Sequence, residues 1–201
     1  MFTRRPALLT VLTAMLFLFS WLLPLAGCSR YDELVQKDQV AATKWADVEA
    51  TLQRRYDLIP NLVETVKANA KFEKDALEAV TKARAEATQL KVDVTDPEAM
   101  KKFNEVQGQL KGSLSRLLVQ AEKYPELKAN ESFRNLQVQL EGTENRILRA
   151  REEYNKAAGE YNAELGKIGG QAVNKVTGMP FKPREFFNMD AGAAAAPKVS
   201  L

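Results

Sequence analysis

Histidine is absent from this chain of 201 residues, and cysteine occurs once, at Cys28. Without histidine, neither a Ser-His-Asp triad nor a histidine-ligated metal site can form. A single cysteine cannot form a disulfide within the chain. The remaining nucleophiles stand in no Ser-x-x-Lys or Gly-x-Ser-x-Gly context. We therefore expect no enzyme activity, no cofactor and no metal.

The sequence also lacks a marked excess of charge of one sign. Its formal net charge is +3, and residues 1–27 hold Arg4 and Arg5 but no acidic residue, so the rest of the chain has 27 basic and 26 acidic residues. The two signs are interspersed, and no basic stripe with interleaved aromatic residues is present. Nucleic acid is therefore not an expected partner.

Long hydrophobic runs are absent except for one, from Ala7 to Leu23, which follows the two arginines. A basic start before an apolar stretch is typical of an export signal. The run has about 17 residues, the short limit for a membrane-spanning helix. An uncleaved membrane helix is therefore the alternative to a signal peptide.

The sequence around the single cysteine favours the signal peptide. Residues 25–28 read "LAGC", which resembles the lipoprotein signal-peptidase motif, in which the cysteine is linked to diacylglycerol. We predict that residues 1–27 are a cleaved signal peptide and that Cys28 is the lipidation site. Several acyl chains on one residue would hold the protein firmly, whereas one chain binds only marginally. By resemblance to enterobacterial lipoproteins, Ser29 favours the periplasmic side of the outer membrane over the inner membrane.

From Tyr31 onward, apolar residues recur alternately three and four positions apart, in segments that start near Tyr31, Val63, Phe103 and Phe133. This spacing predicts helices. Four helices of roughly 25–36 residues with short connections run antiparallel to their neighbours. The predicted fold is all-α, an up-down four-helix bundle over residues 28–170. An aromatic segment, 171–190, and a disordered Ala-rich tail, 191–201, follow it.

Capping residues indicate where these helices begin and end. Asp57 with Pro60, and Asp96 with Pro97, have the spacing of helix starts. Pro125 predicts a helix end, with a restart near Asn130 or Ser132. Because the apolar stripe continues through Pro60, the first two helices could instead form one long kinked rod.

Several long motifs resemble the LemA family: "RRYDLIPNLVETVKANAKFEK", "LEAVTKARA", "ENRILRAREEYNKAAGEYN" and "FKPREFF". The resemblance covers about residues 31–187. It implies a membrane-anchored, long antiparallel helical bundle. It supplies no agreed biochemical activity, although members often occur beside envelope proteins of the TPM-domain type or membrane metalloproteases.

Polar residues interrupt the apolar stripes at similar heights. We predict a polar layer in mid-bundle in which the arginine neutralises an acid, because unpaired burial would cost several kcal/mol. The alternative is that these residues lie at solvated edges. The four residues are Asp38, Glu73, Gln107 and Arg146.

The predicted turns at 54–61 and 124–131 would meet at the end of the bundle far from Cys28. Arginine and tyrosine are enriched in binding hot spots, so this tip is a candidate partner-binding surface. The alternative is structural, with the aspartate capping a helix and the tyrosines closing the core. The residues are Arg54, Arg55, Tyr56, Asp57, Asn61 and Tyr124.

Taken together, these features predict an exported, lipid-anchored protein that acts as an envelope scaffold or protein-binding module, with an envelope protein as its partner. One alternative is a regulatory subunit of a membrane protease. Another is a helical bundle that binds a small molecule or a metal.

Overall fold

A computed structural model describes residues 6–68, 72–178 and 181–188, with side chains from Ser29 onward. The described residues form helices and no strand, which confirms the all-α prediction. Cys28 as a side chain and the tail 191–201 lie outside the described part. The helices are α1 (Pro6–Lys67), α2 (Lys74–Gln89), α3 (Pro97–Ala121), α4 (Pro125–Ala129), α5 (Glu131–Gly166) and α6 (Ile168–Thr177).

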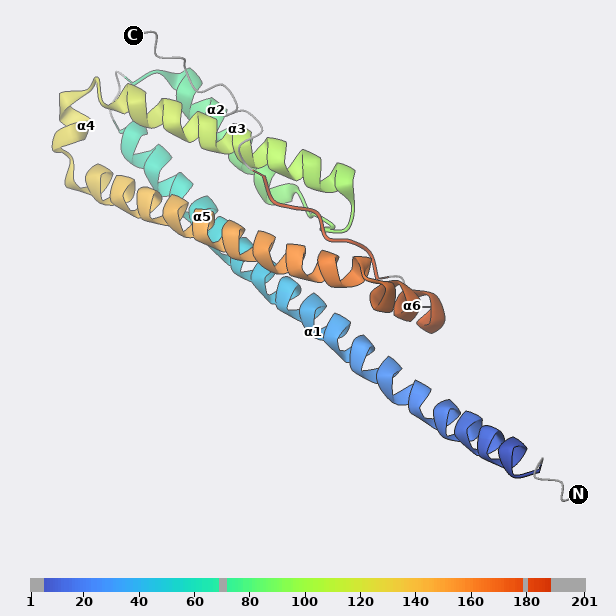
Figure 1. Ribbon diagram of the computed structural model, residues 1–201. Helices are drawn as coiled ribbons and strands as arrows, with labels where there is room; N and C mark the ends of the chain where they lie inside the picture. Colours follow the sequence, from blue (N-terminus) through green and yellow to red (C-terminus); the bar gives the residue numbers. More distant parts are fainter. Residues whose placement is uncertain (1–5, 69–71, 179–180, 189–201) are drawn as a thin grey trace, which may run out of the picture.

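The two longest helices, α1 and α5, lie side by side and run in opposite directions (Figure 1). The pair α2 and α3 packs against the far half of α1, and the short α4 leads from α3 into α5. At the other end, α6 covers the last turns of α5, and α1 continues past it toward the N-terminus. The body therefore has an end next to Ser29 and a far end next to α4.

The predicted helix boundary at Asp57 and Pro60 is wrong. One helix runs from Pro6 through Pro60 to Lys67, and the next begins at Lys74. Proline lacks the N–H that would bond the carbonyl four residues earlier. Here that carbonyl belongs to Tyr56, and it accepts a hydrogen bond from Nε of Arg84 on α2, at 2.8 Å. A side chain thus replaces the missing backbone donor. The helix continues through Pro60, as in the alternative of one long rod.

The other predicted helix starts are observed. Asp96 caps α3, accepting from the backbone N of Glu98 at 2.9 Å, with Pro97 at the first helical position. Asn130 caps α5, accepting from the backbone N of Phe133 at 3.1 Å. These side chains satisfy N–H groups that have no partner within the helix.

The core follows the predicted stripes of α1, α3 and α5. An aromatic cluster lies at its centre, where Trp45 packs on Tyr154 with ring centroids 4.9 Å apart and on Phe103 at 5.5 Å. Phe187, from the C-terminal segment, completes this cluster. A second, smaller cluster next to α6 contains Leu34, Tyr161, Leu165 and Val173. Among the residues with described side chains, no helix is long and apolar enough to cross a membrane.

Candidate functional site

A buried polar cluster occupies the middle of the body. The side chain of Arg55 on α1 is fully buried. It donates to Oε1 of Gln107 on α3, and to Oε1 of Glu144 on α5 at 3.1 Å. Gln107 in turn donates to the hydroxyl of Tyr56 at 2.6 Å. The cluster links three helices, so it fixes how they are placed relative to one another along their axes.

Burial changes the ionisation of one group in this cluster. It raises the pKa of the Tyr56 hydroxyl, although the bond from Gln107 and the charge of Arg55 oppose this. Nε of Arg55 is buried without a hydrogen-bond partner. Arg55 is paired to the partly exposed Glu144, and Gln107 bonds both Arg55 and Tyr56. The arrangement therefore stabilises the packing of the three helices.

The predicted polar layer is wrong for three of its four residues. Gln107 is buried in mid-bundle, but Arg146 is exposed because it lies between the core positions Thr143 and Ile147. Glu73 is exposed at the start of α2 and accepts from Gln120. Asp38 pairs with Arg184 near the other end. The arginine that bonds Gln107 is Arg55, a residue of the predicted turn at 54–61.

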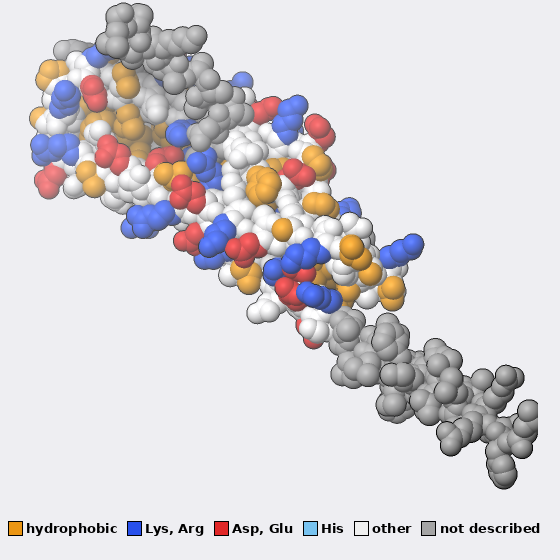
Figure 2. Space-filling model, in the orientation of Figure 1, with side chains coloured by type: hydrophobic (Ala, Val, Ile, Leu, Met, Phe, Trp, Pro, Cys, Tyr) orange, Lys and Arg blue, Asp and Glu red, His pale blue; other side chains and the backbone are white. Residues whose placement is uncertain are grey.

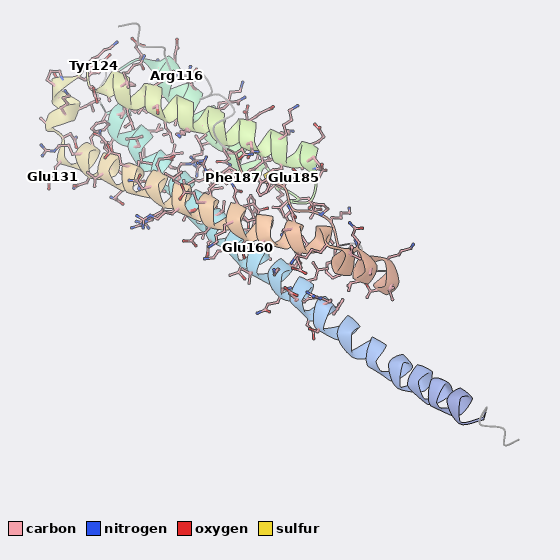
Figure 3. The ribbon with its side chains drawn as sticks, in the orientation of Figure 1. Arg116, Tyr124, Glu131, Glu160, Glu185 and Phe187 are labelled. Carbon is pink, nitrogen blue, oxygen red and sulfur yellow. The ribbon has the colours of Figure 1, made fainter. Side chains whose placement is uncertain are left out.

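The predicted tip is also wrong, because residues 54–61 form no turn and lie inside α1, which continues to Lys67. Arg55 and Tyr56 are buried, whereas Arg54, Asp57 and Asn61 are exposed along the helix. Asp57 accepts from Gln53 at 2.8 Å and caps nothing. Only Tyr124 lies at the far end, where its ring packs on Phe72 at 5.2 Å (Figure 3).

The C-terminal segment 181–188, called the strap here, is held by a repeat on α5. The tripeptide Glu-Tyr-Asn occurs at 153–155 and again at 160–162. Asn155 both donates to the carbonyl of Phe187 and accepts from its N–H, at 3.0 and 2.8 Å. Asn162 makes the same pair of bonds to Arg184, both at 2.8 Å.

The tyrosines of the repeat donate to strap carbonyls. Tyr154 bonds the carbonyl of Glu185 at 2.8 Å, and Tyr161 bonds that of Lys182 at 3.0 Å. Seven helical residues advance about 10.5 Å and three extended residues about 10 Å, so the spacings of α5 and the strap match. Burial raises the pKa of both tyrosines to about 12, so they stay protonated donors at neutral pH.

Further contacts attach the strap to the rest of the body. Arg184 donates to Asp38 on α1 at 2.9 Å, and the backbone N of Glu185 donates to the carbonyl of Val94 at 2.7 Å. Phe187 is fully buried, whereas Phe186 is 43% exposed. Figure 3 shows the strap carrying Glu185 and Phe187 between α3 and α5. The strap thus covers the face of α5 that carries the Tyr-Asn pairs, and its Phe187 joins the core.

An open groove lies near the far end, between the end of α1 and the part of α2 from Lys74 to Ala85. It is open to solvent, and its volume is about 730 Å³. A separate hollow of about 370 Å³ lies between α3 and α5.

The groove has an apolar floor and a basic rim. Val63, Phe72 and Leu77 are among the residues that form its floor. Three lysines and one acid line it as well, namely Lys67, Lys74, Lys82 and Glu78. An apolar strip flanked by lysines suits an amphipathic segment that carries acidic side chains. The sequence pattern does not reveal this surface, because the apolar spacing that starts near Val63 continues past Lys67 to Val80 and predicts no break there.

The described residues contain no group of three or more acidic or cysteine side chains placed to hold a metal ion. The clustered charges are ion pairs instead. Glu164, for example, accepts from Lys167 at 2.7 Å and from Lys37 at 3.3 Å, and these bonds lower the pKa of its carboxyl group.

A model of the LemA family matches residues 44–201. This chain belongs to the LemA family. The match includes the Arg55 cluster, both Glu-Tyr-Asn tripeptides, the groove and the strap, and it begins after the apolar run and Cys28. A comparison with curated proteins finds no match.

For this LemA-family chain, the signal for the buried cluster was present in the sequence. Leu52, Arg55, Ile59 and Leu62 continue the spacing of three and four, which puts an arginine at a core position. The repeated Tyr-Asn pairs were visible too, but their partner in the strap follows only from the folded chain.

Proposed function

We propose that this LemA-family protein is an exported, lipid-anchored module that binds a protein partner at the cell envelope. The motif at residues 25–28 and the apolar run before it support the anchor. The groove supports the binding role, because it combines an open apolar floor with charged residues of mainly one sign.

The position of the groove suits a partner that stands away from the lipid. Ser29 and Val63 lie on the same continuous helix, 34 residues and therefore about 51 Å apart. Anchoring at Cys28 would hold one end of the body at the membrane and leave the groove at the other. A helix of the partner with acidic side chains would bury its apolar face on Phe72 and Leu77.

The charge of the groove gives the test. Lys74→Glu with Lys82→Glu reverses two charges at the rim, whereas Lys101→Glu with Lys102→Glu makes the same change in net charge on exposed residues of α3. We expect the first pair to reduce capture of envelope partners from crosslinked membranes about tenfold or more, and the control pair to leave it unchanged. Equal capture by both variants would refute the groove as the binding site.

The same capture separates the alternatives. Recovery of a membrane protease as the partner would support the regulatory-subunit interpretation. Native mass spectrometry of the purified protein would reveal a bound small molecule or metal, which the binding-module proposal does not require.

A further inference from the structure

Helix α6 has apolar side chains on two faces. Its inner face packs Val173 against Leu34 and Tyr161. Its outer face presents Ile168, Ala172 and Val176, which are four residues apart and form one stripe. Ile168 is 88% exposed and Val176 is 85% exposed, the highest values among the exposed large hydrophobic residues of the described chain. The outer stripe meets no other described part of the molecule.

Tight packing holds α6 in place. A Cβ atom added at Gly170 would lie 2.9 Å from the carbonyl oxygen of Leu165 and even closer to that of Glu164, so only glycine fits there. Gly178 ends the helix with a φ of 62°, the left-handed conformation that glycine adopts without strain. The exposed stripe therefore belongs to a helix with a defined position.

That position is next to the N-terminal end of the body. A Cβ atom added at Gly169 would lie 3.8 Å from the side chain of Arg30. Arg30 is two residues after Cys28, about 3 Å along the helix axis. Figure 2 shows hydrophobic side chains gathered at this end of the body, with basic side chains beside them. With the proposed anchor, whether acylated Cys28 or the apolar run 7–23, this end would face the bilayer.

The charges around α6 suit an anionic lipid surface. Glu164 is nearly buried, whereas Arg30 and Lys167 beside it are more than half exposed. Arg30, Lys167 and Lys175 are the exposed basic side chains nearest the stripe.

We propose that the outer face of α6 lies in the interfacial layer of the membrane that anchors the chain, as a second contact beside the N-terminus. Helices of this kind bury an apolar face at the level of the lipid headgroups while basic residues contact anionic lipids. The stripe is short, but the anchor gives it a high effective concentration at the lipid surface, so a weak contact suffices. A second contact beside the N-terminus would fix the tilt of the body relative to the membrane.

Tryptophan substitutions in the full chain test this proposal. Ile168→Trp and Val176→Trp place the probe on the stripe, and Val138→Trp is the matched control on an exposed valine of α5 toward the far end. Each variant is reconstituted in vesicles of phosphatidylethanolamine and phosphatidylglycerol with brominated acyl chains. The emission of the unsubstituted protein, from Trp45 and any retained Trp21, is subtracted.

We expect brominated lipid to quench the added tryptophan of the two stripe variants by about half or more, and aqueous iodide to quench only the control. Quenching of the stripe variants by iodide to the same extent as Val138→Trp would overturn the proposal. Protection from iodide without quenching by lipid would overturn it too, because a second copy or another protein would then cover the stripe. This contact rests on the membrane anchor of the proposed function but not on the groove, so its failure and the failure of the groove are distinguishable.

Discussion

At the scale of single residues, Arg55 shows how hydrogen-bond partners compensate for the burial of a charged side chain. A buried arginine is costly to desolvate, and its value depends on the partners that satisfy it. Gln107 and Glu144 supply those partners from two other helices. The cluster is therefore stable as a whole and sensitive to the loss of any member.

Replacing Arg55 by alanine tests that sensitivity. The change removes the shared donor, leaves Gln107 with an unpaired buried oxygen and opens a cavity. We expect the free energy of unfolding to fall by about 3 kcal/mol or more, measured by urea denaturation followed by circular dichroism. Arg54→Ala, at the exposed neighbouring position, should change it by less than about 0.5 kcal/mol. Similar effects of the two substitutions would contradict the assigned role of Arg55.

Pro60 and Arg84 form a second pair whose role can be measured. Arg84→Met removes the donor to the Tyr56 carbonyl while keeping an aliphatic side chain, and should destabilise the protein by about 1 kcal/mol. Pro60→Ala restores the backbone N–H, so the same arginine substitution should then cost less. A double-mutant cycle measures the coupling free energy between Pro60 and Arg84. Equal costs in both backgrounds would show that Arg84 does not compensate for the proline.

At the scale of elements, the apolar periodicity predicted most of the helical core. Capping residues and prolines predicted some helix boundaries correctly and one wrongly. Asp96 and Asn130 cap helices because nothing in the fold overrides them. Pro60 failed as a boundary signal because Leu58, Ile59 and Leu62 are buried around it and Arg84 satisfies the freed carbonyl. Burial of this kind outweighs the cost of one proline.

The strap could not be placed from the sequence, because its eight described residues have no regular hydrogen-bonding pattern of their own. Its backbone is satisfied by Asn155, Asn162 and the two tyrosines, which are more than twenty residues away. The groove could not be predicted either, because it forms where α1 ends and α2 begins. The sequence pattern placed that boundary near Pro60, whereas α1 ends at Lys67.

The tyrosine donors make attachment of the strap dependent on pH. The folded pKa of Tyr154 and Tyr161 is about 12, above the ordinary value of 10. Their stabilising contribution is therefore complete below pH 10 and is lost as the pH rises toward 12. We expect hydrogen exchange of the strap amides, corrected for intrinsic rate, to increase over that range. In Tyr154→Phe with Tyr161→Phe the strap should be weaker at neutral pH and the alkaline increase smaller. An unchanged alkaline increase would contradict this.

At the scale of the whole molecule, the continuous α1 joins the proposed anchor to the proposed binding surface. Cys28→Ser removes the thiol that lipidation requires and should abolish incorporation of labelled fatty acid. It should also leave the leader uncut or release the protein from the membrane. Ser29→Ala is a control that keeps the thiol and should still be labelled. Labelling of the Cys28→Ser protein would exclude lipidation at this residue.

The most direct test of the central claim is photocrosslinking from the groove in intact cells. A benzoylphenylalanine at Thr81, an exposed residue of the groove, probes the proposed surface, and one at Thr88, exposed on the same helix outside the groove, is the control. The account predicts a discrete adduct with an envelope protein from position 81 and none from position 88. Absence of an adduct from position 81, or equal adducts from both positions, would contradict a protein-binding role for the groove.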